Sequence, residues 1–265
     1  MDFMRFPAEL QLLIAEKLES QELSYLCRAN HYFHSLCTPA LERLAQDPRK
    51  CALKWAIIYN YLPLIQLLLS KGHDMNDLGR GSGFATALHV AVSCRNYPLI
   101  RLFLKNPALD LNKLDINGNT ALHLAIRWRD LEAVKLLDTA GVDLEIADRC
   151  GRTALLLALH YCNVRIIEFL VRNGANVNAR LPAGTTLDVT LLHGLVWPKC
   201  ERLVRLALEY GADPEVRDDE NWRPIDIAFV KGFTGIMDIL REVSLPPDVD
   251  VVSDLESVWS DASSG

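Results

Sequence analysis

Two cysteines and two histidines near the amino terminus have the residue types and the spacing of a possible metal site. Cys27, His31, His34 and Cys37 form the pattern C-x3-H-x2-H-x2-C, and helical spacing would bring His31 and His34 to one face. Thiolates and imidazoles are the ligands of tetrahedral structural zinc. However, an Ala-Asn pair between them is expected to interrupt the helix, and structural zinc usually uses two separate knuckles. We therefore expect no metal and no other cofactor.

The sequence contains none of the motifs that mark the common enzyme classes. It has no glycine-rich phosphate loop, no H-E-x-x-H and no G-x-S-x-G. Carboxylates are plentiful, but they are scattered over predicted turns and helix surfaces. We expect no catalytic residue and no enzymatic activity, with a hydrolase of an unrecognised kind as a remote alternative.

The charge of the chain is concentrated at one end. Of the net charge of −6 over 265 residues, five negative charges lie in residues 246–265, which hold no Lys or Arg. The remainder is nearly neutral, so counterion release would contribute little to nucleic-acid binding. The longest apolar run, 61–69, is far shorter than a membrane span. We expect a cytoplasmic or nuclear protein, or both, with no nucleic-acid and no membrane partner.

The seven cysteines show no C-x-x-C pair and no regular framework. In a chain without a signal peptide this pattern favours reduced thiols. We expect them to fill small gaps in the core.

A hexapeptide recurs through the middle of the chain. Its copies read TALHVA at 86–91, TALHLA at 120–125, TALLLA at 153–158, TLLHGL at 190–195 and RPIDIA at 223–228, after a weaker CALKWA at 51–56. Successive copies start 33 to 37 residues apart, and each is followed by a second apolar helical pattern. A repeated unit of this length predicts a stack in which neighbouring units bury one another.

The letters of one unit predict its local structure. The initial Thr can cap a helix, and the small residue five positions later lets a neighbouring helix approach. Asp and Gly in DINGNT and DRCGRT favour a tight hairpin between units. Four units close with a glycine suited to a left-handed helix end, namely Gly72, Gly141, Gly174 and Gly211. The predicted unit is helix, turn, helix, hairpin.

These units resemble ankyrin repeats, whose hallmark T-P-L-H-x-A appears here with Ala in place of Pro in three copies. The resemblance covers residues 50–244 with about six units, the first and last atypical. It implies that His89, His123 and His193, at the fourth motif position, bond to nearby backbone and are structural. The fifth unit has four extra residues before TLLH. Either its first helix is about one turn longer or its hairpin is enlarged.

Residues 1–46 lack the repeat pattern and are expected to form a separate unit. Pro7 suits a helix start, and the apolar spacing in 6–36 predicts three short helices. Three short helices enclose only a small core, so some of their apolar side chains should remain uncovered.

This segment resembles an F-box, in which FPAEL matches the Leu-Pro-x-Glu-Leu opening and HYFHSL the third helix, although Phe6 and Phe33 replace the usual Leu and Trp. An F-box ahead of ankyrin repeats is an arrangement associated with fungal proteins. The resemblance implies binding to a Skp-family adaptor, which bridges to a cullin-based (SCF-type) ubiquitin ligase. The implied adaptor-binding residues are Phe6, Pro7, Glu9, Leu10, Ile14, Leu23 and Phe33.

The sequence therefore predicts a mainly α protein with a three-helix F-box (1–46), an ankyrin-repeat solenoid (50–244) and an acidic tail (245–265) whose composition is typical of disorder. The expected function is substrate recognition for the ubiquitin ligase, with a target protein bound by the repeats. The alternative is an ankyrin-repeat interaction scaffold whose first helices only cap the solenoid.

The target should bind where hairpin tips and first-helix ends line a concave face, as the ankyrin resemblance implies. Aromatic residues and Arg recur there, which is the composition of a binding hot spot. The expected target-binding residues are Arg127, Trp128, Arg149, Arg152, His160, Tyr161, Trp197 and Trp222. Such a surface suits an acidic or phosphorylated segment, and the acidic tail could occupy it when no target is bound. The alternative is that Trp128 and Tyr161 merely pack against each other.

Overall fold

The computed structural model describes residues 52–58, 60, 62–70, 72–78, 86–181, 190–197 and 199–243, which divide into two compact units between Asp143 and Leu144. The F-box-like segment, the Cys27/His31/His34/Cys37 pattern and the acidic tail lie outside the described residues. So do all the expected adaptor-binding residues, Phe6, Pro7, Glu9, Leu10, Ile14, Leu23 and Phe33.

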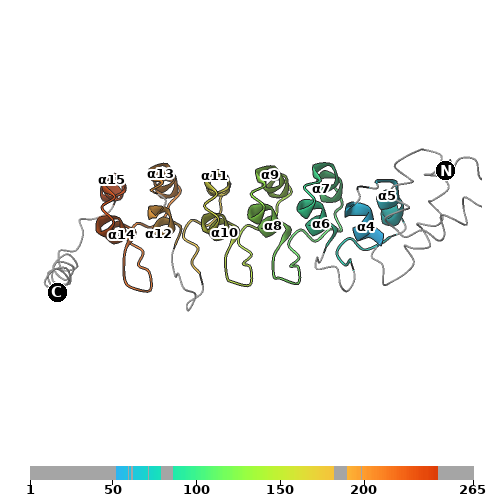
Figure 1. The fold of residues 1–265 in the computed structure, drawn as a ribbon, viewed down its shortest axis with the longest axis horizontal. Helices are drawn as coiled ribbons and strands as arrows, with labels where there is room; N and C mark the ends of the chain where they lie inside the picture. Colours follow the sequence, from blue (N-terminus) through green and yellow to red (C-terminus); the bar gives the residue numbers. More distant parts are fainter. Residues whose placement is uncertain are drawn as a thin grey trace, which may run out of the picture. The chain divides into compact units, whose positions relative to one another are not determined.

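The first unit is built from three helix pairs (Figure 1). They are α4 (Ala52–Ile58) with α5 (Leu62–Ser70), α6 (Ala87–Ser93) with α7 (Tyr97–Leu104), and α8 (Ala121–Arg127) with α9 (Leu131–Thr139). The first helices α4, α6 and α8 pack in one row, and α7 packs against α9 in a second row. The two rows form the two helical layers of this unit.

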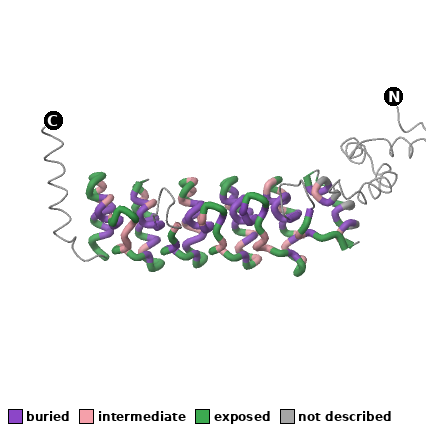
Figure 2. The backbone as a smooth tube through the Cα atoms, turned by 90° about the horizontal axis from the view of Figure 1, so that it is seen from below, coloured by how far each residue is buried: buried purple, intermediate pink, exposed green. Residues whose placement is uncertain are grey.

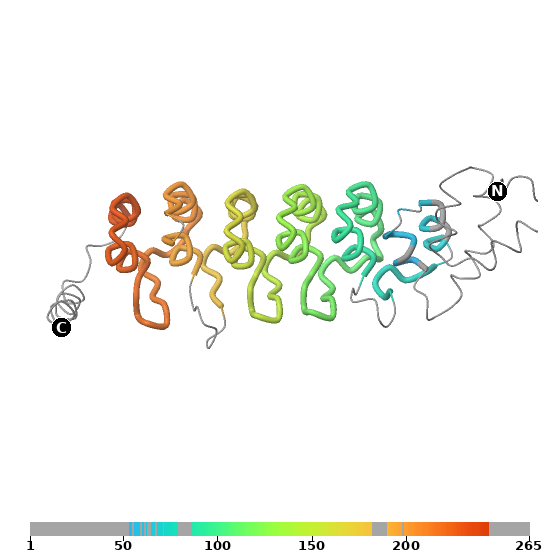
Figure 3. Tube along the Cα trace, viewed as in Figure 1, coloured from blue at the N-terminus to red at the C-terminus, as the bar shows by residue number. Residues whose placement is uncertain are grey.

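The second unit repeats this arrangement. Its pairs are α10 (Ala154–His160) with α11 (Val164–Arg172), α12 (Leu191–Val196) with α13 (Glu201–Glu209), and α14 (Pro224–Val230) with α15 (Thr234–Val243). The row α10, α12, α14 lies against the row α11, α13, α15. Figure 3 shows the loop before α14 extending away from both layers. The described chain is thus mainly helical, with the predicted pairing of helices.

Apolar side chains of both layers form the core of each unit, and Figure 2 shows buried and exposed stretches alternating along the helices. The small motif residues Ala91, Ala125, Ala158 and Ala228 are fully buried, as predicted. In the fifth unit this position holds Leu195, and Gly194 precedes it. A Cβ on Gly194 would lie 2.3 Å from Leu159 Cδ2, so a larger residue here would require the Leu159 side chain to move.

The motif threonines cap their helices in only half of the cases. The Thr86 and Thr120 hydroxyls accept a hydrogen bond from the backbone N–H of His89 and His123, as predicted. Thr153 and Thr190 make no such bond, so the capping prediction is wrong at these two helices. At α12 the Thr190 hydroxyl instead bonds to His193 Nδ1 at 2.9 Å.

The predicted left-handed helix ends are confirmed. Gly72, Gly141, Gly174 and Gly211 have φ between 79° and 86°. An L side chain rarely adopts this region, which is why the sequence places glycine here.

The loops before α8, α10 and α14 make the predicted tight turn, but the described residues contain no β-strand. Each loop has two backbone bonds, for example from Asp115 N to Asn119 O at 2.8 Å and from Gly118 N to Asp115 O at 3.0 Å. The aspartate carboxylate satisfies the other donors, since Asp115 Oδ1 accepts from the N–H groups of Asn117 and Asn119. The expected β-hairpin is thus a loop closed by a carboxylate instead of a ladder of backbone bonds.

The structure excludes one of the two alternatives for the fifth unit and corrects one further prediction. Helix α12 has six residues, fewer than the seven of α10, so the first helix of the fifth unit is not longer. The extra residues precede Thr190, next to segment 182–189, which lies outside the described residues. The described cysteines are not core fillers: Cys94, Cys150 and Cys162 are exposed and Cys200 is half-buried. They lie in turns and at helix ends, where no core surrounds them.

Candidate protein-binding surface

The motif histidines connect each first helix to the loop of the next pair. His89 Nδ1 lies 2.7 Å from Thr86 Oγ1, and its Nε2 lies 3.0 Å from the carbonyl oxygen of Asn119. A carbonyl only accepts, so Nε2 carries the proton and Nδ1 accepts from the Thr86 hydroxyl. Burial lowers the pKa of His89, which keeps this imidazole neutral.

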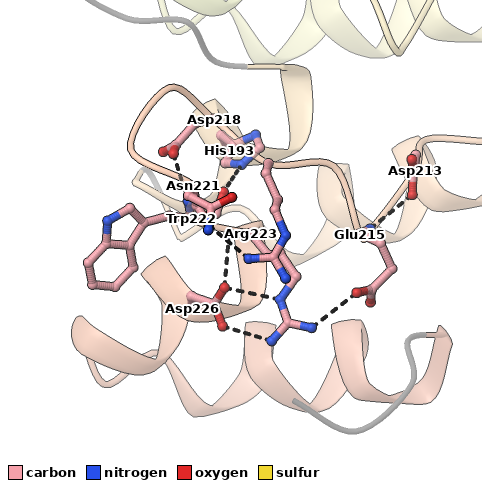
Figure 4. A network of polar contacts seen from close by, with 9 residues as sticks. His193, Asp213, Glu215, Asp218, Asn221, Trp222, Arg223 and Asp226 are labelled. Carbon is pink, nitrogen blue, oxygen red and sulfur yellow. Dashed lines mark hydrogen bonds and ion pairs between the residues drawn. The ribbon is translucent and has the colours of Figure 1, made fainter. Parts of the chain in front are cut away.

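The other two motif histidines lie in the same environment. His123 Nδ1 is 2.8 Å from Thr120 Oγ1, and His193 Nε2 is 2.9 Å from the Trp222 carbonyl (Figure 4). All three histidines are buried. The predicted structural role of His89, His123 and His193 is confirmed.

Two helices depart from this Thr-x-x-His arrangement. At α10 the histidine is replaced by Leu156, and the buried Thr153 hydroxyl has no hydrogen-bond partner. At α14 the pair is Arg223 and Asp226, both buried. The last unit has therefore exchanged a neutral polar pair for an ion pair.

The Arg223 guanidinium is held by two carboxylates (Figure 4). Its Nε and Nη2 donate to Asp226 at 3.0 and 3.1 Å, and its Nη1 donates to Glu215 at 3.0 Å. The hydrogen bonds to Asp226 raise the pKa of Arg223 further above its usual range. These hydrogen bonds connect the start of α14 to the loop that follows α13.

In the first unit the expected target-binding residues lie at the end of α8. Arg127 is its last residue and Trp128 is its C-cap, and both are exposed, Trp128 by 52%. The Trp128 carbonyl accepts a bond of 2.6 Å from Arg95, whose guanidinium also lies 3.8 Å from Asp130. The backbone that carries Trp128 is therefore fixed while its indole is open to solvent.

In the second unit the expected residues have different environments. Arg149 and His160 are exposed, and Tyr161 is half-buried with its ring edge against His160. The Arg152 Nη2 forms a 2.8 Å ion pair with Asp148. Burial alone would raise the pKa of Asp148, but hydrogen bonds from the side chain and backbone of Arg152 lower it overall. Arg152 thus supports its own loop, and its side chain is only partly exposed.

The remaining two expected residues are both tryptophans. Trp222 is half-buried, its backbone bonds to Asp218 and His193, and its indole points away from Arg223 (Figure 4). Trp197 is the C-cap of α12 and is 61% exposed. Its neighbours were missed by sequence reasoning: Lys231 lies over the Trp197 ring, and Lys199 lies over Phe233. The available signal for Lys231 was its position, because it stands eight residues after its motif start, as Trp128 and Tyr161 do after theirs.

The turns that carry these exposed side chains share one backbone feature. Arg95, Arg129, Cys162 and Lys199 have φ between 49° and 54° at the turn from first to second helix. A non-glycine residue in this region stores strain, which the packed helices on both sides overcome. The turns present their side chains at fixed and repeated positions.

The outer helices offer a less suitable surface. A shallow depression over α11 and α13 is lined mainly by charges of both signs, with Glu168 paired to Arg172 and Arg202. Such exposed pairs are satisfied by each other and by water. Among the described residues no group of three potential metal ligands is present, and none of the described helices has the length and apolar character needed to cross a bilayer.

Comparison with known proteins identifies the repeats. A family model described as "Ankyrin repeats (3 copies)" matches residues 53–148 and 88–181, which confirms the predicted ankyrin repeats. The chain is 42% identical over 118 residues to human NF-kappa-B inhibitor zeta, covering 42% of this chain and 16% of that protein. It is 30% identical over 203 residues to human B-cell lymphoma 3 protein, covering 75% of this chain and 43% of that protein.

The fold matches a solved structure of the same group. The crystal structure of the ankyrin repeat domain of Bcl-3, described as a member of the IkappaB protein family, superposes with a TM-score of 0.63 and 23% identity. The match covers 73% of this chain and 86% of that domain. The chain spans less than half of the length of the two curated relatives.

Proposed function

We propose that this ankyrin-repeat protein is an IkappaB-like binding protein that recognises a partner of the NF-kappa-B kind through the exposed ends of its first helices. The observation that carries the proposal is the 42% identity with a protein named as an NF-kappa-B inhibitor. The longer alignment with B-cell lymphoma 3 protein supports it over most of the repeats.

The geometry of the first-helix ends supports a binding role. Trp128 and Trp197 are large, rigid side chains exposed at the C-caps of α8 and α12, each beside basic residues. Tryptophan and arginine are over-represented among the residues that dominate protein interfaces. Because they lie on helix ends whose turns are fixed, little conformational entropy would be lost when a partner binds.

Binding of an NF-kappa-B dimer to the full chain, measured by biolayer interferometry, tests the proposal. Trp128→Ala and Trp197→Ala should each weaken binding by roughly thirtyfold, as loss of about 2 kcal/mol per hot spot implies, and the double variant should weaken it further. Tyr210→Ala is the matched control, because Tyr210 is also an exposed aromatic C-cap but lies at the end of the second helix α13. No binding by the wild type, or an equal loss in Tyr210→Ala, would overturn the proposal.

A second candidate function is the ubiquitin-ligase adaptor, and the observation that favours it is the F-box-like letter order Phe6-Pro7-x-Glu9-Leu10. We expect the full chain to capture a Skp-family adaptor in a pull-down and Leu10→Arg to abolish the capture. Burial of such a leucine contributes about 1.5–3 kcal/mol, and an unpaired charge in its place would cost more. If wild type and Leu10→Arg retain equal amounts of adaptor, or none, the segment only caps the repeats.

A further inference from the structure

Two lysines and two aromatic rings form one cluster between the last two helix pairs. Lys231 Nζ lies 4.5 Å from the ring centre of Trp197, and Lys199 Nζ lies 4.3 Å from that of Phe233. Trp197 and Lys199 belong to the turn after α12, whereas Lys231 and Phe233 belong to the turn after α14. Each cation therefore lies over a ring of the other pair. We call Trp197, Lys199, Lys231 and Phe233 the lysine–aromatic cluster.

Trp197 and the two lysines of the cluster are exposed, and the carboxylate beside it, that of Glu201, lies against Gly235. Among the described residues neither lysine forms an ion pair with Glu201 or with another carboxylate. Contact with the rings holds the two ammonium groups in place without neutralising them. A ligand with carboxylates would therefore meet two positioned cations beside an open indole, and its apolar side chains could cover that indole.

The chain itself contains a segment of this chemistry. Residues 246–265 hold Asp248, Asp250, Asp254, Glu256 and Asp261, no basic residue, and apolar side chains that include Trp259. They follow α15, which begins at Thr234 directly after Phe233 of the cluster. The carboxylates of this segment are complementary to the two lysines of the cluster, and its apolar side chains are suited to contact the exposed Trp197 indole.

The reach of the chain also fits. The ten residues of α15 (Thr234–Val243) rise about 15 Å away from the cluster. From Val243 to Asp248 an extended chain spans at most about 17 Å, so a return along α15 brings the first carboxylates to the cluster. The acidic loop Asp218–Glu220 lies at the opposite end of α14 and would repel the segment, which directs it to the lysine end.

We propose that residues 246–265 of this chain dock on the lysine–aromatic cluster, with carboxylates on Lys199 and Lys231 and apolar side chains over Trp197. The docked segment covers Trp197 and so competes with any partner that uses this indole. The docking does not depend on the proposed function, whereas the competition does. Failure of one is therefore distinguishable from failure of the other.

Carbodiimide cross-linking of the full chain tests the docking, because it joins only carboxylates and amines in direct contact. At low protein concentration we expect mass spectrometry to find Lys199 and Lys231 joined to the acidic residues of 246–265. Lys135, an exposed lysine on α9, is the control and should give about tenfold less product. The product should decrease at 1 M salt, where screening acts over about 3 Å.

Charge reversal separates docking from loss of folding. Lys199→Glu with Lys231→Glu should abolish the product, and adding Asp248→Lys with Asp250→Lys should restore a cross-link between the exchanged positions. Both lysines are exposed, so the helical circular dichroism signal should not change. Equal labelling of Lys135, no product, or product only between two molecules in an isotope-mixed sample would each overturn the proposal.

Discussion

The helices α8 and α10 have the same N-cap residue, Thr, and the same first two residues, Ala-Leu, yet their first turns are held differently. At α8 the Thr120 hydroxyl contacts both the backbone N–H and the Nδ1 of His123, at 3.3 and 2.8 Å. At α10 the histidine is replaced by Leu156, and the Thr153 hydroxyl is buried without a partner. The difference shows that the histidine supplies a partner for the hydroxyl: without it, Thr153 contributes a desolvated hydroxyl.

The start of α14 is held in a third way, by the buried ion pair between Arg223 and Asp226. Disrupting this ion pair should have the largest effect on stability. Arg223→Met leaves Asp226 buried without its cation, so the free energy of unfolding should fall by about 3–5 kcal/mol in a urea titration followed by circular dichroism. Arg101→Met is the matched control, because the Arg101–Glu132 pair is about half exposed and should contribute at most about 1 kcal/mol.

Restoring the motif sharpens this test. Arg223→Thr with Asp226→His rebuilds the neutral pair of the other units, so we expect it to recover most of the stability that Arg223→Met loses. A double variant as unstable as Arg223→Met would show that Glu215 also requires the arginine.

The next largest effect should come from the satisfied histidine pairs. His89→Leu removes one hydrogen bond each from the Thr86 hydroxyl and the Asn119 carbonyl, both buried, and copies the residue found at Leu156. The Thr86 hydroxyl keeps the backbone N–H of residue 89 and the Asn119 carbonyl keeps that of Asp115, so the loss of two buried hydrogen bonds should lower the free energy of unfolding by about 1–3 kcal/mol. Leu156→Ile, which changes shape at the equivalent site without removing a bond, should cost less than about 1.5 kcal/mol. Equal losses in the two variants would mean that packing, and not hydrogen bonding, explains the motif.

The architecture could be predicted from the sequence because the information is local and repeated. The Thr-x-x-His copies and the four terminal glycines mark where each pair begins and ends, and Gly141 or Gly174 is required by its own backbone angle. The missing hydrogen-bond partner of the Thr153 hydroxyl could not be predicted from the motif. Its hydroxyl lacks a partner because of the residue three positions later, which the pattern treats as a tolerated variant.

The candidate surface could be predicted only in part. Trp128 and Trp197 were selected by residue type and motif position, and both are exposed. Lys199, Lys231 and Phe233 were missed, because their contacts join residues from different repeats. Such contacts depend on how the turns of two neighbouring repeats lie side by side in space. Residue positions counted within a single repeat do not give this arrangement.

A pH titration distinguishes a satisfied histidine from its leucine replacement. Burial lowers the pKa of His89 below 6.5, so the unfolded chain takes up a proton more readily than the folded one. This contribution to stability is present above pH 6.5 and is lost as the pH falls below it. The melting temperature of the wild type should therefore fall more steeply between pH 7 and 5 than that of His89→Leu. Parallel pH profiles would show that His89 does not carry the effect.

The smallest expected effect tests the unsatisfied threonine itself. Thr153→Val replaces a buried hydroxyl that has no partner by a methyl group of the same shape, so the free energy of unfolding should stay unchanged or rise by up to about 1 kcal/mol. Thr120→Val makes the same replacement where the hydroxyl caps α8 and contacts His123, and it should cost about 1–2 kcal/mol. Because the two substitutions remove the same atoms, differences in helix propensity and side-chain volume cancel between them. If Thr153→Val destabilises the protein as much as Thr120→Val does, the hydroxyl at α10 is satisfied in solution and the two helix starts are equivalent after all.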